Sequence, residues 1–218
     1  MIKFLEKLLS LIYISSCFYC GSAKDDKILC DKCKRKINFM PPSNIKEMYG
    51  CKIYACTLYE DVIKKLIKDL KYHKKKKLAK LHAEIMYEYF TRLKLNEDFL
   101  ILSVPIHKNR LKERKYNHME LVADELSKIS GFKNNKKFLL RIKDTKKQFK
   151  LHRNERIKNI KNAFELNPNQ NIDKNRQLLI IDDITSTGIT LEEIIKLLKN
   201  NGYNNLTAIA LATPDVWN

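Results

Sequence analysis

The segment from Leu178 to Thr190 constrains the fold of this chain more than any other stretch. Leu178 to Ile181 form an apolar run of the length of a buried strand, and two adjacent acids, Asp182 and Asp183, follow directly. A small hydroxyl-rich loop with one glycine comes next, and then an amphipathic helix over 191–200. This order predicts one unit of an α/β fold, with the polar loop at the carboxyl end of the strand.

The acid pair and its loop also indicate a kind of ligand. Two carboxylates at the end of a core strand are costly to bury unless they hold something. The loop enters a helix N-terminus, which offers backbone N–H groups, hydroxyls and the positive end of a dipole. Carboxylates beside a phosphate cradle suit a sugar phosphate. The alternative is an ordinary strand–loop–helix unit with a polar N-cap.

The same residues resemble the loop that binds phosphoribosyl pyrophosphate (PRPP) in type I phosphoribosyltransferases. That loop has four apolar residues, two acids and a Thr-Thr-Gly-type turn. The resemblance implies that Asp182 and Asp183 are the catalytic pair and hold the ribose hydroxyls, directly or through Mg²⁺. It also implies a cradle for the 5′-phosphate, formed by Thr185, Ser186, Thr187, Gly188 and Thr190.

Strands and helices alternate along the rest of the chain. Periodicity predicts strands at 50–59, 99–104, near 136–142, 177–182 and 205–213, and helices at 1–16, 60–72, from the lysine run at 74–77 to 95, 117–130 and 191–200. We read 143–160 as a charged segment. This alternation predicts a mainly parallel sheet with helices on both faces. With the resemblance above, the expected architecture is a type I phosphoribosyltransferase-like fold.

Four of the six cysteines form two pairs with metal-ligand spacing, Cys17-x2-Cys20 and Cys30-x2-Cys33. Two such knuckles supply the four thiolates of a tetrahedral zinc site, and a site closed by four cysteines is structural rather than catalytic. The alternative is two disulfides of a secreted protein. Cys51 and Cys56 lie in an expected strand and are read as buried thiols.

Length and charge bound the organisation. The 218 residues suit one domain with a small appendage, so we expect an N-terminal helix and a four-cysteine zinc finger over 1–42 and a phosphoribosyltransferase-like domain over 43–218. A net charge of +18 attracts polyanions, although part of it reflects solvated lysine faces. The aromatic residues Tyr54, Tyr59 and Tyr72 near Lys74, Lys75, Lys76 and Lys77 suggest a surface for single-stranded DNA. A solvated helix face is the alternative.

The N-terminus has two interpretations. Lys3 and Lys7 precede an apolar stretch, and Ile14 to Cys17 look like a lipoprotein cleavage box. Helical periodicity, with Glu6 interrupting the apolar segment, favours instead an amphipathic helix that packs on the cysteine module or touches a membrane surface. We expect a cytoplasmic protein, with peripheral membrane association and contact with competence proteins as open options.

A second polar loop supplies positive charge. Val104 and Pro105 end an expected strand, and five Lys or Arg side chains follow by residue 115. Arg offers paired N–H groups to phosphate oxygens. The stretch resembles the Val-Pro…Arg-x3-Arg-Gly-Phe-Asn pattern of the ComF family, competence-associated proteins with a phosphoribosyltransferase-like domain. Arg141-x3-Thr145-x2-Gln148, the segment Arg156-x2-Asn159-x3-Ala163-Phe164 and the cysteine knuckles resemble the same family.

The resemblance to the ComF family implies further roles. Val104 and Pro105 would shape the pyrophosphate loop, Arg110 and Arg114 would contact pyrophosphate, and Thr145, Gln148 and Arg156 would belong to a flexible loop closing over the ligand. A solvated basic face is the alternative for Arg114 and Arg156.

Some positions depart from the family pattern. Lys115-Tyr116 stands where the family has Gly-Phe, and Asn162 replaces a glycine. His107 and His118 have no second ligand at metal spacing, so we expect them to bind no metal.

Three functions fit these features. The favoured one is a protein that binds PRPP and single-stranded DNA and assists DNA uptake or handling during natural transformation. An active phosphoribosyltransferase with an unidentified acceptor is the second, and a PRPP-sensing regulator the third. No acceptor-recognition element is visible, so the sequence leaves open whether the protein is an enzyme.

Overall fold

The computed structural model describes residues 16–22, 28–145 and 153–217. Its helices and strands are α2 (Asp31–Lys34), β1 (Ile45–Met48), β2 (Cys51–Leu58), α3 (Asp61–Tyr72), α4 (Leu78–Arg92), β3 (Phe99–Ser103), α5 (Lys108–Arg114), α6 (His118–Ser130), β4 (Lys133–Asn134), β5 (Leu139–Arg141), α7 (Arg153–Ile160), β6 (Phe164–Leu166), β7 (Gln177–Ile184), α8 (Ile189–Asn200) and β8 (Leu206–Thr213). The expected helix at 1–16 lies outside the described residues, except for its last position.

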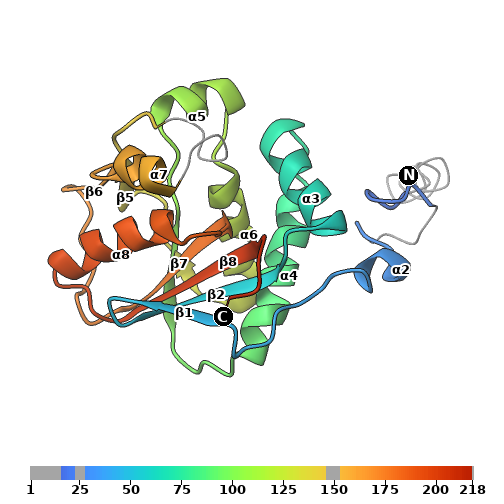
Figure 1. Ribbon diagram of the computed structural model, residues 1–218, viewed down its shortest axis with the longest axis horizontal. Helices are drawn as coiled ribbons and strands as arrows, with labels where there is room; N and C mark the ends of the chain where they lie inside the picture. The colour runs from blue at the N-terminus through green and yellow to red at the C-terminus, as the bar shows by residue number, and fades with distance from the viewer. Residues whose placement is uncertain (1–15, 23–27, 146–152, 218) are drawn as a thin grey trace, which may run out of the picture.

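A six-stranded sheet in the order β1-β2-β8-β7-β3-β4 forms the centre of the molecule. Only β1 runs antiparallel to its neighbour, and the other pairs are parallel. Helices cover both faces (Figure 1). The expected mainly parallel α/β sheet is therefore confirmed.

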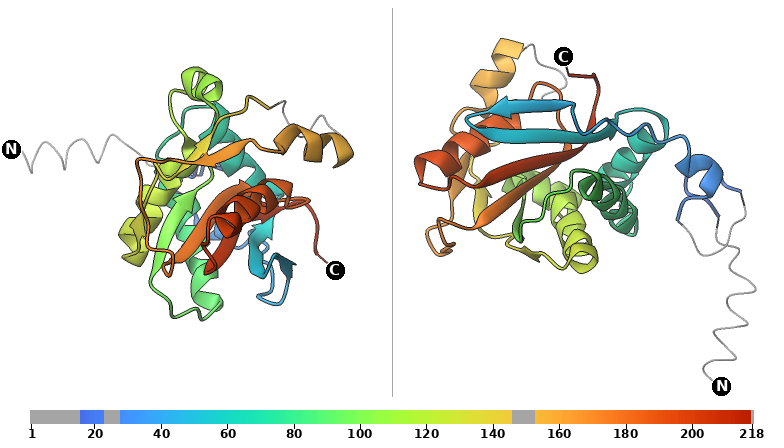
Figure 2. Two further views of the ribbon diagram at one scale, coloured as in Figure 1. Left: turned by 90° about the vertical axis from the view of Figure 1, so that its left-hand side faces the viewer. Right: turned by 90° about the horizontal axis from the view of Figure 1, so that it is seen from below.

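The apolar core has two halves, one on each face of the sheet. Ile181 faces the half that also contains buried residues of α3, α4 and α6, whereas Ile180 faces the half that contains α8. Successive side chains of a strand point to opposite faces, so this alternation carries into the acids at the end of β7. Figure 2 shows α8 on one side of the sheet and the α3, α4 and α6 layer on the other.

Several segments differ from expectation. Residues 108–114, expected as loop, form α5, which ends at Lys115. The strand near 136–142 is β5, which pairs with β6 in a separate two-stranded sheet rather than extending the main one. The charged segment 143–160 contains α7, and β1 follows directly on residues expected as linker. These elements are short, so local periodicity does not specify them.

The cysteine module lies beside α3 and α4 (Figure 1). Leu29, Cys33 and Ile37 of the module are buried in the same apolar cluster as α3 and α4, and Lys34 forms an ion pair with Glu88 at 3.1 Å. Within the described ranges, no helix is long and apolar enough to cross a bilayer.

Candidate functional site

Two polar loops meet at the carboxyl edge of the sheet. β3 and β7 are parallel neighbours, with Ser103 opposite Ile181, and the Val104 N–H donates to the Ile181 carbonyl at 3.0 Å. The loop that begins at Val104 and Pro105 therefore starts beside Asp182 and Asp183. The sequence prediction that these loops share one edge is correct.

The two acids face different sides of the sheet. Asp183 points toward α3 and α6, where Lys71 and His118 contact its carboxylate. Asp182 follows the pleat of Ile180 toward the half of the core that contains β5 and α8. Its Oδ1 accepts a hydrogen bond from the Asp183 N–H at 2.8 Å. The pair thus serves two neighbouring subsites rather than presenting two parallel carboxylates.

Asp183 is a buried charge with two protein donors. Lys71 Nζ lies 2.5 Å from Asp183 Oδ2, and His118 Nε2 contacts the same oxygen. Burial alone would raise the pKa of Asp183, but Lys71 and His118 hold it well below its usual range. Asp183 is therefore ionised at neutral pH.

His118 connects the acid pair to the basic loop. Arg114 Nη1 lies 3.3 Å from His118 Nδ1, and a guanidinium only donates. The Nδ1 atom therefore accepts, so the proton is on Nε2 and is donated to Asp183. Burial lowers the pKa of His118, although the Asp183 charge opposes this, and the neutral ring fits that tautomer. His118, for which the sequence indicated no role, is therefore part of the site.

Two arginines gather on the side of Asp182. Arg110 Nη2 donates to the Thr145 carbonyl at 2.7 Å, and Arg141 Nη2 donates to Thr145 Oγ1 at 2.5 Å. Burial, and next the charge of Arg110, lower the pKa of Arg141 to about 10. Burial, and next the charge of Asp183, raise the pKa of Asp182 to about 7. This side therefore combines excess positive charge with a carboxyl that is half protonated near neutrality.

The loop after the acids has the geometry of a phosphate cradle. Gly188 adopts a φ of 83° and precedes α8 as an N-cap residue that has no side chain to bond the first N–H groups of the helix. A Cβ at this position would lie 2.7 Å from Met48 Cε, the end of a flexible side chain that can shift, so the backbone angle is what favours glycine. Lys46 Nζ donates to the Ser186 carbonyl at 2.9 Å and ties the loop to β1.

A buried hydroxyl at the start of this loop has no partner. Among the described residues, no group bonds to Thr185 Oγ1, although Thr185 is buried. An orphaned buried polar atom beside a helix N-terminus is the kind of group that a bound ligand satisfies. Ser186 and Thr187 follow it in the same loop, and Thr190 lies in the first turn of α8.

Both positions that depart from the family's glycines keep a glycine-like backbone. Lys115 has a φ of 68° and Asn162 a φ of 55°, in the left-handed region that glycine adopts at low cost. At Lys115 this conformation ends α5 through a bond from its N–H to the Leu111 carbonyl at 2.7 Å. The chain therefore retains the turns but with strained residues.

The acid pair has the chemistry of a magnesium site. Mg²⁺ in proteins commonly takes one or two carboxylates and completes its shell with water and substrate phosphates. Asp182 and Asp183 are carboxylate donors on the two sides of the end of β7, and the unpartnered Thr185 hydroxyl lies two residues beyond Asp183. These residues fit Mg²⁺ carried by a phosphorylated sugar.

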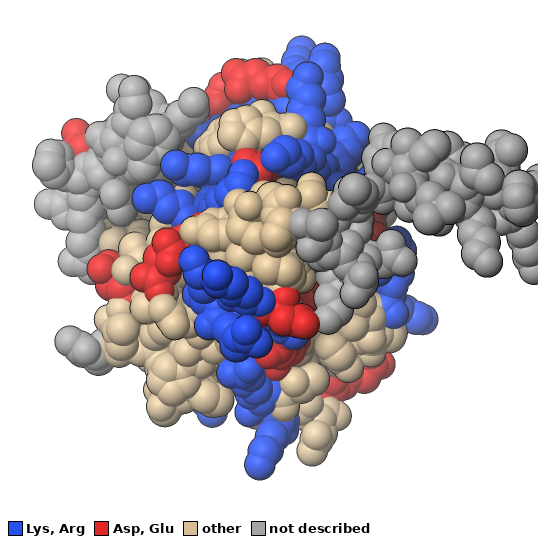
Figure 3. Space-filling view, turned by 90° about the vertical axis from the view of Figure 1, so that its right-hand side faces the viewer, with Lys and Arg blue, Asp and Glu red and all other residues tan. Residues whose placement is uncertain are grey.

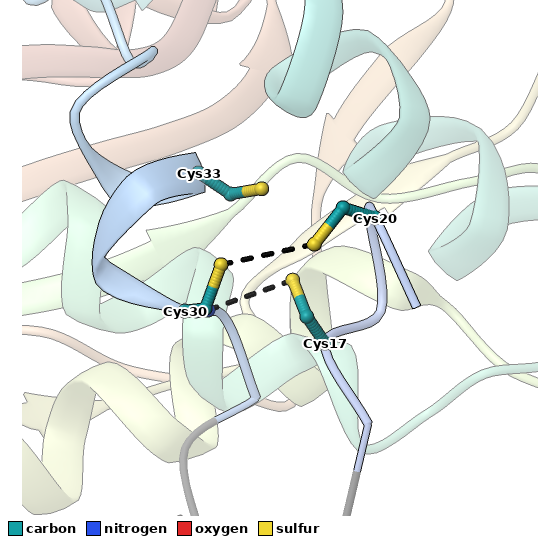
Figure 4. Close-up of side chains that lie close together, drawn as sticks. All are labelled: Cys17, Cys20, Cys30 and Cys33. Carbon is teal, nitrogen blue, oxygen red and sulfur yellow. Dashed lines mark hydrogen bonds between the residues drawn. The ribbon is translucent and has the colours of Figure 1, made fainter. Parts of the chain in front are cut away.

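The four paired cysteines gather at one point. Their Sγ atoms all lie within 4.8 Å of one another, and Cys20 Sγ is 3.8 Å from Cys30 Sγ (Figure 4). Zn–S bonds of about 2.3 Å in a tetrahedron require S···S distances of about 3.8 Å. The Cys30 N–H also donates to Cys17 Sγ at 3.5 Å. All six cysteines are free thiols, so the disulfide alternative has no support here.

The predicted lysine surface is exposed, but one of its lysines, Lys75, is held in an ion pair. Lys74 to Lys77 are all exposed. Asp69 is buried beside them and accepts from Lys75 Nζ at 2.8 Å and Lys65 Nζ at 2.9 Å. Figure 3 shows Lys and Arg side chains over this side of the molecule, interrupted by acidic groups.

The aromatic partners need one correction. Tyr54 lies in β2 and its side chain packs in the apolar core with α3 and α4. It is only 5% exposed, so it cannot stack on a base. Tyr72 is exposed, with Arg114 over its ring at 5.0 Å. Tyr59 lines a cavity of about 490 Å³ with Tyr19 of the cysteine module and lysines of α3.

The remaining predicted residues fall outside what the structure describes. Gln148 lies outside the described residues, as does the side chain of Arg156, whose backbone is in α7. The sequence reasoning missed Lys71, His118 and Arg141 as site residues. Arg141 alone had a signal, because it opens the Arg-x3-Thr motif, whereas Lys71 is one of several lysines spaced along α3.

Comparisons with known proteins agree with this geometry. Residues 120–214 match the phosphoribosyl transferase domain family, a range that contains the acid pair, its loop and α8. The chain is 31% identical over 121 residues to competence protein F of Haemophilus influenzae, covering 56% of this chain and 52% of that protein. It thus spans about half the length of this relative.

Two solved structures are more distantly similar. Adenine phosphoribosyltransferase from Leishmania tarentolae aligns with a TM-score of 0.37 and 15% identity, covering 67% of this chain and 75% of that one. Adenine phosphoribosyl transferase from Trypanosoma brucei, in complex with AMP, pyrophosphate and ribose-5-phosphate, aligns with a TM-score of 0.38 and 11% identity, covering 90% of this chain and 84% of that one. At these scores neither structure bears on the assignment.

Proposed function

We propose that this chain, a relative of competence protein F with a phosphoribosyl transferase domain, binds PRPP with Mg²⁺ at the carboxyl edge of its sheet. The 31% identity to competence protein F confirms the resemblance to the ComF family. The match of residues 120–214 to the phosphoribosyl transferase domain family confirms the phosphoribosyltransferase type of fold. The observation that carries the proposal is the set of groups that meet at this edge. They are the two carboxylates of β7, the N-terminus of α8, and one arginine each from α5 and β5.

Each part of that edge suits one part of PRPP. The backbone N–H groups before α8 and the Thr185 hydroxyl suit the 5′-phosphate. Asp182 and Asp183 suit the ribose hydroxyls. Arg110 and Arg141, held together by Thr145, suit the pyrophosphate, because guanidinium groups pair with phosphate oxygens. Mg²⁺, when bound, would neutralise phosphate charge between these groups.

We further propose that the protein binds single-stranded DNA and assists DNA uptake or handling in natural transformation. Support comes from the name of the relative, the net charge of +18 and the exposed lysines at 74–77. The lysines would contact phosphates, and Tyr72 and Tyr59 offer faces on which bases stack. The cysteine cluster would hold a structural Zn²⁺ that fixes Tyr19 beside α3.

A titration of zinc-replete protein with labelled single-stranded DNA tests the second proposal. Changing all of Lys74–Lys77 to Gln should weaken binding and lower the magnitude of the salt slope, because each phosphate contact releases counterions. The charge-matched control changes Lys137, Lys158, Lys161 and Lys174, which are exposed elsewhere. If both variants lose the same affinity, the site assignment is wrong and only net charge matters.

The domain match favours a second candidate function, transfer of the phosphoribosyl group to an acceptor. In that reaction a nucleophilic atom of the acceptor would form a bond to C1 as the bond from C1 to the pyrophosphate oxygen breaks, and the acceptor's proton would pass to solvent. Pyrophosphate would leave with the electron pair of the broken bond, and Arg110 and Arg141 would stabilise its charge. Incubation with Mg-PRPP and a panel of bases should then release pyrophosphate. If the protein binds PRPP but releases no pyrophosphate, transfer is excluded for the bases tested and PRPP binding without catalysis remains, as in a PRPP-sensing regulator.

A further inference from the structure

Lys71 does not occupy the place that its sequence context predicts. It belongs to the lysine-bearing face of α3, one turn after Lys68, which is exposed. Its side chain is only 18% exposed, and its Nζ lies 2.5 Å from Asp183 Oδ2, on the face of the sheet that α3 covers. An ammonium placed on a buried carboxylate neutralises a charge that would otherwise be costly to bury.

The oxygen that Lys71 contacts is already used by a second donor. His118 Nε2 donates to the same Asp183 Oδ2. With both donors in place, the lone pairs of this oxygen are used. A ribose hydroxyl or a cation that binds Asp183 Oδ2 must therefore displace one of the two donors.

The two donors differ in how readily they can move. The His118 ring is 5% exposed and is held at both nitrogens, by Asp183 and by Arg114, at the first turn of α6. Lys71 reaches the carboxylate through a flexible four-carbon stem and is more exposed. Rotation of that stem moves the ammonium toward solvent without disturbing the backbone of α3.

We infer that Lys71 is a displaceable counter-ion for Asp183. In the ligand-free protein it compensates the charge of the carboxylate, and a divalent cation carried by the sugar phosphate takes its place, while His118 continues to position Asp183. The inference rests on the proposed function for the identity of the sugar phosphate, but not for the exchange of one cation for another.

Binding of Mn²⁺ alone to zinc-replete protein, followed by the electron paramagnetic resonance signal of the free ion, tests this role. Removing a positive charge from beside the site should make Lys71→Met bind Mn²⁺ about tenfold more tightly than wild type. Lys71→Arg should bind as wild type does, because it keeps the charge. Lys68→Met, which removes a lysine one turn earlier, should also be unchanged.

Folding of each variant is checked by thermal unfolding, and Lys71→Gln, which keeps a donor without the charge, repeats the test if Lys71→Met does not fold. Equal Mn²⁺ affinity in the neutral Lys71 variants and in Lys68→Met would overturn the inference. So would a loss of Mg-PRPP binding at unchanged Mn²⁺ affinity, because Lys71 would then be a direct ligand contact. The wild type could also fail to bind Mg-PRPP while Lys71→Met binds Mn²⁺ more tightly than wild type. That pair of results would refute the proposed function and support the role of Lys71 as a counter-ion.

Discussion

The cysteine cluster and the acid pair are both sets of ligating side chains, but their partners come from different distances along the chain. All four cysteines lie between positions 17 and 33, and their sulfurs meet through two local turns. Asp183 is compensated by Lys71 from α3 and His118 from α6, far away in sequence. A local site is readable from spacing, whereas a compensated buried charge depends on the whole fold.

Loss of the metal should have the largest effect. Cys30→Ser combined with Cys33→Ser should abolish binding of one Zn²⁺ per chain and unfold the module, since structural zinc sites contribute about 10–16 kcal/mol. Metal analysis and limited proteolysis of the segment before residue 43 measure this. Cys51→Ala is the control, because Cys51 is buried outside the cluster. A double variant that retains stoichiometric zinc would contradict the assignment.

Removing His118 should cost less but still destabilise strongly. His118→Ala leaves a buried carboxylate with one donor fewer and an empty space at the start of α6, so we expect a loss of about 3 kcal/mol. Urea unfolding of zinc-replete protein measures it. His118→Gln, which can still donate to Asp183, should recover part of the loss. A cost below about 1 kcal/mol would show that Lys71 alone compensates Asp183.

The same isosteric change at the two acids should have opposite effects on stability. The pKa of Asp182 is raised to about 7, so the folded state binds more protons than the unfolded state between about pH 4 and 7 and stability falls as the pH rises through this window. Asp182→Asn removes this pH-dependent loss of stability. The change that it causes in the free energy of unfolding should therefore be more favourable at pH 8 than at pH 5, by about 2 kcal/mol.

Asp183 has a lowered pKa, so its contribution is present above the unfolded value near 4 and is lost only as the pH falls further. Asp183→Asn should therefore destabilise at both pH 5 and pH 8, because it leaves Lys71 without its partner. Chemical denaturation at the two pH values measures both variants. Effects of the same sign would show that the two carboxylates share one environment.

The strained turn should give the smallest effect. Lys115→Gly relieves a left-handed backbone angle and should stabilise by about 1 kcal/mol. Asn162→Gly should gain only a few tenths of a kcal/mol, because asparagine tolerates this conformation. Thermal unfolding compares them. No gain at Lys115 would mean that its side chain contributes as much as the strain costs.

The elements with strong periodicity were predictable from sequence. The strand Leu178 to Ile181 and its helix, the apolar face of α3 and the cysteine spacing each follow from local pattern. The short elements β1, α5 and β6 were not, because each is too short to carry a periodic pattern of its own.

The site divides along the same line. The acids, Gly188 and the basic loop could be read from residue type and spacing. The contacts of Lys71 and of the His118 ring with Asp183 could not, because they depend on how α3 and α6 pack on the sheet. The prediction that Tyr54 contacts DNA was wrong for the same reason. The sequence pattern of β2 does not show that helices cover the face on which Tyr54 lies.

A calorimetric titration of zinc-replete protein with PRPP in the presence of Mg²⁺ tests the central claim most directly. We predict saturable binding of one PRPP per chain, at least about tenfold tighter than binding of ribose 5-phosphate, because Arg110 and Arg141 hold the pyrophosphate. Asp182→Asn combined with Asp183→Asn should abolish it. The absence of saturable binding to the wild type, or equal affinity in the double variant, would contradict the account.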